Sequence, residues 1–164
     1  MTNSTDEASS RNSNKIDTIV VIPTLNEAAH IADVVFDLMA DDAAASRAEL
    51  WVVDGGSADG TRNVVQNLSA SLPQLRWLDN PERIQASAVN LAALEARRLG
   101  GVRYLIRADA HARYPAGWIS RLIDAAEAEG ADSVVVPMRT CGGGAMRDAS
   151  AGLVQYLLGH RGAG

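Results

Sequence analysis

The stretch that sets the fold reads TIVVIPTLNE and covers residues 18–27. Its apolar run, residues 19–22, is unbroken and ends at Pro23, which is typical of a strand buried on both faces of a sheet. The residues that follow are polar, and apolar side chains then recur at helical spacing. They are Ile31, Val34, Val35, Leu38 and Met39. A buried strand followed by an amphipathic helix is the unit of parallel sheets, so this stretch predicts an α/β fold.

The same alternation of short β-branched runs and longer helical patterns continues along the chain. It predicts further strands at 50–53, 75–78, 104–106 and 133–136. It predicts helices through 64–68, over 85–99, at 118–126 and through 153–158. Because parallel crossovers are right-handed, we expect a layered, mostly parallel sheet with helices on both faces, a Rossmann-like architecture.

Composition limits the classes of function. The chain has 164 residues, 47% of them hydrophobic, which suits one globular domain with a core. Its formal net charge is −5, and no basic block is present to bind nucleic acid, so we expect no nucleic-acid partner. Cys141 is the single cysteine, which excludes an intrachain disulfide and makes the cytoplasm the default compartment.

The polar N-terminal residues indicate where the folded domain begins. Residues 1–16 are rich in Ser, Thr, Asn and charge, lack the apolar core of a secretory signal, and predict a mobile tail. No stretch approaches the roughly 20 apolar residues of a membrane helix. We therefore expect one folded domain over 17–164.

Polar segments follow three of the predicted strands, at 23–27, 54–61 and 107–111. Ligands of open parallel sheets bind outside the carboxyl ends of the strands, so we expect these segments to line one rim. The first turn lacks the glycines of a dinucleotide-binding oxidoreductase, and no P-loop sequence is present. A bound diphosphate would therefore need another source of positive charge, for which a divalent metal is the usual choice.

Asp109 and His111 are the candidate metal ligands. In an extended segment residues i and i+2 point to the same side, so a carboxylate and an imidazole would face one cation, which suits manganese or zinc better than calcium. The alternative, with about even weight, is that Asp109 caps the following helix and His111 is a surface residue.

Two other carboxylates also allow two interpretations. Asp54 closes an apolar strand, where a carboxylate that binds a base or ribose is expected, but Asp-Gly-Gly-Ser is also good turn chemistry. Asp59 or Ser57 is positioned to cap the next helix. Glu27 is a candidate ligand-binding residue, although Thr24-x-x-Glu27 equally fits a capping box.

Four segments together resemble the family-2 glycosyltransferases of the nucleotide-diphospho-sugar transferase type, over about 19–137. They read VVIPTLNE (20–27), VVDGGSADGT (52–61), NPERIQASAVNLA (80–92) and RADAHARYP (107–115). The last segment is most similar to the bacterial exopolysaccharide, succinoglycan-type branch, in which Asp-x-His replaces Asp-x-Asp. The resemblance implies the nucleotide-sugar-binding half of a GT-A-type fold.

The resemblance also implies site residues and partners. The donor nucleotide would be bound by residues of the rim and of the segment beside it, namely Pro23, Glu27, Asp54, Arg83, Asn90 and Asp109. Asp109 and His111 would hold a divalent cation, Mn²⁺ or Mg²⁺, against the diphosphate. A metal stabilises the charge on a departing nucleoside diphosphate, and a carboxylate base assists attack by the acceptor, with inversion at the sugar.

No residue of this chain matches the family's general base, so the catalytic residue is unknown and is expected beyond Gly164. We therefore expect a transferase whose acceptor half is incomplete, acting on a saccharide or lipid-linked acceptor in polysaccharide biosynthesis. The alternative is a non-catalytic nucleotide-sugar-binding remnant. A nucleotidyltransferase would require a Gly-rich, basic first loop, which 23–27 does not provide. By analogy with exopolysaccharide relatives, the inner face of the cell membrane is also an expected location.

Overall fold

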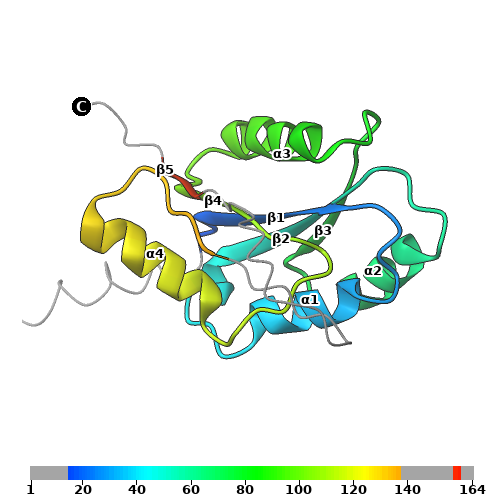
Figure 1. Ribbon diagram of the computed structural model, residues 1–164, viewed down its shortest axis with the longest axis horizontal. Helices are drawn as coiled ribbons and strands as arrows, with labels where there is room; N and C mark the ends of the chain where they lie inside the picture. Colours follow the sequence, from blue (N-terminus) through cyan, green and yellow to red (C-terminus); the bar gives the residue numbers. More distant parts are fainter. Residues whose placement is uncertain (1–14, 138–156, 160–164) are drawn as a thin grey trace, which may run out of the picture.

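One sheet organises the described residues, 15–137 and 157–159, of the computed structural model (Figure 1). Its strand order is β3-β2-β1-β4-β5, with β1 to β4 parallel and β5 antiparallel to β4. The strands are β1 (Thr18–Thr24), β2 (Ala48–Asp54), β3 (Leu75–Asp79), β4 (Tyr104–Arg107) and β5 (Leu157–Gly159). The helices are α1 (Ile31–Met39), η1 (Ala45–Arg47), α2 (Thr61–Ser69), α3 (Gln85–Leu99) and α4 (Trp118–Glu129). The predicted mostly parallel α/β sheet is confirmed.

Helices cover both faces of the sheet, as predicted. Figure 1 shows α3 alone on one face and α1, α2 and α4 on the other. The side chains of β1 alternate between these two layers. Ile19 and Val21 pack in the cluster with α3, whereas Val20 and Ile22 pack in the larger cluster with α1 and α4. All four are fully buried, which explains the unbroken apolar run.

The register of the strands brings their carboxyl ends level. Thr24 of β1 is opposite Asp54 of β2, which is opposite Asp79 of β3. On the other side of β1, pairing with β4 ends at Val21 and Arg107. Pro23 has no N–H to continue that ladder, so β1 and β4 separate at this point. The loops after the strands therefore meet at one edge of the sheet.

Two predicted elements are wrong. Residues 133–136 do not form a strand, and Leu157 and Leu158 lie in β5 rather than in a helix. The place beside β4 is taken by β5, so Val134 and Val136 only pack against the core without a ladder. Short apolar runs fit helix and strand equally well, which is why the pattern misassigned both segments.

Several expectations lie outside the described residues: most of the polar tail, the general base, Leu153 and Val154. Ile16, expected in the tail, packs against the α3 side of the core. None of the helices in the described ranges is long and apolar enough to cross a membrane.

Candidate functional site

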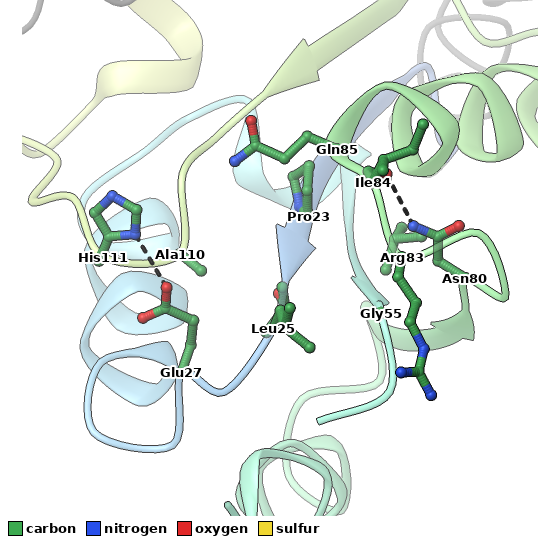
Figure 2. Close-up of a pocket in the computed structure, with 12 residues that line it drawn as sticks. Pro23, Leu25, Glu27, Gly55, Asn80, Arg83, Ile84, Gln85, Ala110 and His111 are labelled. Atoms are coloured by element: carbon green, nitrogen blue, oxygen red, sulfur yellow. Dashed lines mark hydrogen bonds and ion pairs between the residues drawn. The ribbon is translucent and has the colours of Figure 1, made fainter. Parts of the chain in front are cut away.

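A cavity of about 250 Å³ lies at the carboxyl edge of the sheet, where the loops meet (Figure 2). Its wall comes from segments that are distant in sequence: the end of β1, the end of β2, the β3–α3 connection and the loop after β4. The lining residues are Pro23, Thr24, Leu25, Glu27, Val53, Gly55, Asn80, Arg83, Ile84, Gln85, Ala110 and His111. Four of the predicted site residues therefore line the cavity: Pro23, Glu27, Arg83 and His111.

The loops after β1 and β2 are joined by hydrogen bonds between backbone N–H groups and side-chain oxygens. The bonds run from Asn26 N to Ser57 Oγ (2.7 Å), Glu27 N to Thr61 Oγ1 (2.9 Å), Ala28 N to Asp59 Oδ2 (3.0 Å) and Ala58 N to Asn26 Oδ1 (2.9 Å). Asn26 holds a left-handed backbone (φ 57°), which asparagine tolerates better than most residues. These bonds fix the position of one side of the cavity.

Asp54 is buried and organises its own loop. Its Oδ2 accepts N–H bonds from Gly56 and Ser57, both at 2.8 Å, and its Oδ1 accepts the Ser57 hydroxyl. Its side chain is not part of the cavity wall. Asp54 thus makes the contacts that the turn interpretation predicts, and its contact with a base or ribose stays a prediction.

Asp59 stabilises the start of α2. Asp59 lies one position before Gly60, the cap residue of α2, and its Oδ1 accepts the N–H of Thr61 at 3.0 Å. The Ser57 hydroxyl donates to Asp54 instead. The hydrogen bond from the Thr61 hydroxyl, followed by that from the Ala28 N–H, lowers the pKa of the Asp59 carboxyl. The cap residue itself is Gly60, which makes no side-chain cap bond, so the prediction that Asp59 or Ser57 caps this helix is wrong.

Glu27 does not form a capping box. The Thr24 hydroxyl donates to the Ile22 carbonyl within β1, and α1 begins only at Ile31. The carboxylate of Glu27 instead faces the loop after β4, where its Oε1 lies 3.0 Å from His111 Nδ1 (Figure 2). The capping interpretation of Glu27 is therefore wrong.

Asp109 lies behind the cavity wall and is 2% exposed. Its Oδ1 accepts a bond from Arg107 Nη2 at 2.8 Å, and its backbone N–H donates to the Tyr114 hydroxyl at 2.6 Å. Its Oδ2 is buried without a hydrogen-bond partner among the described residues, as is Arg107 Nε. Because α4 begins only at Trp118, the interpretation of Asp109 as a helix cap is wrong.

The segment from Asp109 to His111 is a turn and not extended. The Ala112 N–H donates to the Asp109 carbonyl, so the premise that both side chains point to the same side is wrong. The side chain of His111 is 61% exposed and lies on the cavity wall, whereas that of Asp109 is buried. No three His, Cys, Asp or Glu side chains of the described ranges gather as a metal cluster.

Asp109 and His111 nevertheless have the donor types that a divalent cation takes, although Asp109 lies behind the wall on which His111 lies. The unpaired Oδ2 of Asp109 and the imidazole of His111 supply one hard oxygen and one nitrogen donor. This donor pair suits Mn²⁺ better than Ca²⁺.

The β3–α3 connection forms the opposite wall. Arg83 has a left-handed backbone (φ 61°), and its guanidinium lies against Gly56, where a Cβ would be 3.4 Å from Nη2. Asn80 lines the cavity although the sequence analysis missed it. Its side chain donates to the Ile84 carbonyl at 3.0 Å and accepts the Ser87 hydroxyl at 2.8 Å. Asn90 is exposed on α3, outside the cavity wall.

Asn80 had a usable signal in the sequence. It follows β3 directly, so the rule that ligands bind outside the carboxyl ends of strands would have selected it, had it been applied to the third strand as to the others.

A mostly parallel sheet of this order, with helices on both faces and a cavity at its carboxyl edge, matches the GT-A fold of the solved glycosyltransferase structures described below. The family model "Glycosyl transferase family 2" matches residues 19–159. The chain belongs to this family. It is 42% identical over 160 residues to the succinoglycan biosynthesis protein ExoA of Rhizobium meliloti (strain 1021), covering 97% of this chain and 46% of ExoA. The chain thus spans about half the length of this relative.

Solved structures share the fold. The mannosyltransferase PcManGT from Pyrobaculum calidifontis, in complex with GDP-Man and Mn²⁺, is 29% identical with a TM-score of 0.55, over 63% of this chain and 30% of PcManGT. S. aureus TarS 1-349 is 17% identical with a TM-score of 0.66, over 81% of this chain and 39% of that one. TarS has also been solved in complex with UDP-GlcNAc.

Proposed function

We propose that this chain binds a nucleotide-diphospho-sugar and serves a glycosyltransferase that acts in polysaccharide biosynthesis. The observation that carries the proposal is the cavity itself, which has Arg83 on one wall and the Glu27–His111 pair on another (Figure 2). Relatives that bind GDP-Man or UDP-GlcNAc support a donor of this class. The acceptor in this proposal is a saccharide or a lipid-linked saccharide, and the compartment is the cytoplasm or the inner face of the membrane.

The two walls have different tasks in this proposal. Arg83 provides positive charge for the diphosphate. Pro23 and Asn80 shape the nucleoside end, and Asp54 acts through the loop that it holds in place. Asn90 lies further along α3 and would contact only a ligand that extends beyond the cavity.

Asp109 and His111 would hold a divalent cation, Mn²⁺ or Mg²⁺. When bound, the cation would supply charge neutralisation for the departing nucleoside diphosphate. Arg107 orients the Asp109 carboxylate in this proposal, through the 2.8 Å ion pair between Arg107 Nη2 and Asp109 Oδ1. Transfer would proceed with inversion, and no general base is assigned among the described residues.

Isothermal titration tests the proposal, with GDP-Man and UDP-GlcNAc as probes in the presence and absence of Mn²⁺. We expect one of the two to bind in a Mn²⁺-dependent manner, and Arg83→Ala to weaken it. His111→Ala should weaken the binding as well. His30→Ala is its matched control, because His30 is exposed at the start of α1 and outside the cavity wall. Lack of binding by both probes would refute the proposal.

An activity assay separates the enzyme from the binding remnant. The same chain is incubated with the bound donor and with saccharide or lipid-linked acceptors. Transfer of the sugar supports the glycosyltransferase. Donor binding without transfer and without donor hydrolysis supports a domain that binds nucleotide sugars only.

A further inference from the structure

We propose that Glu27 is a positioning residue that fixes the tautomer of His111, so that Nε2 is free to bind the cation. The inference rests on the proposed function for the identity of the cation, but its first test does not. It assigns Glu27 a role different from the binding of the donor nucleotide that the family resemblance implied. The observation behind it is the 3.0 Å contact between Glu27 Oε1 and His111 Nδ1.

Glu27 is the fixed member of the pair. Its backbone N–H donates to Thr61 Oγ1, and its carbonyl accepts N–H bonds from His30 and Ile31 at the start of α1. Its side chain is 18% exposed, whereas that of His111 is 61% exposed on a turn. The carboxylate therefore holds the imidazole, rather than the reverse.

The chemistry of the contact determines which nitrogen carries the proton. An ionised carboxylate can only accept hydrogen bonds, so Nδ1 must donate. In a neutral imidazole the other nitrogen, Nε2, then has a free lone pair and can act as a metal ligand. Histidines that bind metals usually donate their second N–H to a carboxylate or carbonyl in this way.

The charges around the pair also favour a cation. Glu27 and Asp109 contribute two negative charges, and Arg107 neutralises that of Asp109 through its 2.8 Å ion pair. One uncompensated negative charge thus remains beside His111. A divalent cation would be attracted to this wall, whereas the diphosphate would be attracted to Arg83 opposite.

The first experiment measures the tautomer in the metal-free protein without nucleotide. Imidazole ¹⁵N shifts are recorded at about pH 8.5, where an ordinary histidine is neutral, and the His111 signals are assigned with His111→Ala. We expect the Nδ1–H tautomer in the wild type and in Glu27→Gln, whose amide oxygen still accepts. Glu27→Ala should move His111 toward the Nε2–H form that free imidazole side chains favour. A wild-type Nε2–H tautomer, or no change in Glu27→Ala, would overturn the inference.

The second experiment measures Mn²⁺ affinity by electron paramagnetic resonance with GDP or UDP bound. Glu27→Ala should weaken Mn²⁺ binding about 10- to 100-fold, as loss of an outer-shell partner typically does, and Glu27→Gln by much less. Glu129→Ala at the end of α4 is the control and should have no effect. If neither nucleotide binds, the proposed function fails while the tautomer result stands. If nucleotide and Mn²⁺ bind equally well to Glu27→Ala, the inference fails alone.

Discussion

The paired loops after β1 and β2 and the loop after β4 contain the same kinds of residue but use them differently. In the paired loops Asn26, Asp54 and Asp59 all bond to groups of those loops. In the β4 loop Asp109 has a buried oxygen without a partner among the described residues, and His111 is exposed on the cavity wall.

This difference in hydrogen bonding separates loops that hold the structure together from a loop that has groups left to bind a ligand. Buried polar groups without partners are costly and uncommon, so the unpartnered oxygen of Asp109 is the group in this loop to which a ligand or water could bind. The paired loops therefore build one side of the cavity, whereas in our proposal the β4 segment supplies the groups that bind the cation. Substitutions in the first region should lower stability, and substitution of His111 should lower affinity.

The largest effect is expected for Asp54→Ala. It removes the acceptor of three hydrogen bonds in a buried turn, so the free energy of unfolding should fall by about 2–3 kcal/mol. Urea denaturation measures the loss. Asp54→Asn keeps one acceptor oxygen and should lose less. A loss below about 0.5 kcal/mol for Asp54→Ala would mean that the turn does not depend on this carboxylate.

His111→Ala should show the reverse pattern. Mn²⁺-dependent affinity for the nucleotide should fall about 10- to 100-fold, which corresponds to about 1.4–2.7 kcal/mol. The free energy of unfolding should stay within about 0.5 kcal/mol of the wild type, because the side chain is mostly exposed. Titration calorimetry and urea denaturation of one preparation give both numbers. If His111→Ala bound the nucleotide as tightly as the wild type but was less stable, His111 would be a structural residue like those of the paired loops.

Asn26 allows a finer test of the paired loops. Asn26→Gly keeps the left-handed backbone but loses the bond from the Ala58 N–H, so we expect a loss of about 1 kcal/mol. Asn26→Ala adds the cost of a left-handed alanine, about 1 kcal/mol more. Thermal denaturation of both variants measures the difference. Equal stability of the two would show that the backbone at 26 relaxes.

The smallest effect is a pH dependence at Asp59. Its pKa in the folded chain lies below the ordinary value of 3.8, so its contribution to stability is fully present above that value and is lost as the pH falls through the folded pKa. The stability difference between wild type and Asp59→Asn should therefore shrink between about pH 5 and pH 3. A difference that is constant over this range would contradict the role of Asp59 in joining the loops.

The helices and strands that could be predicted from the sequence are the buried ones. The unbroken apolar run of β1 and the spacing of Trp118, Ile119 and Leu122 predicted buried elements, since period and burial are linked. The edge of the sheet at β5 was missed, because a strand of three residues has too little pattern to distinguish it from a helix.

The location of the candidate site could be predicted from the sequence, but the contacts between its side chains could not. Polar residues after parallel strands gather at one rim by topology, which brought Glu27 and His111 to the same cavity. That these two side chains touch across 84 residues depends on a turn after β4, and no spacing rule gives it. The sequence likewise allowed two interpretations of Asp54. Its hydrogen bonds place it in its own turn, and its contact with a donor stays a prediction.

The most direct test of the account is a crystal structure of the chain with GDP or UDP and Mn²⁺, with anomalous diffraction recorded at the manganese edge. We expect an anomalous peak within bonding distance of His111 Nε2, with the diphosphate between that peak and Arg83. A manganese peak away from His111, or a nucleotide bound outside the cavity, would contradict it.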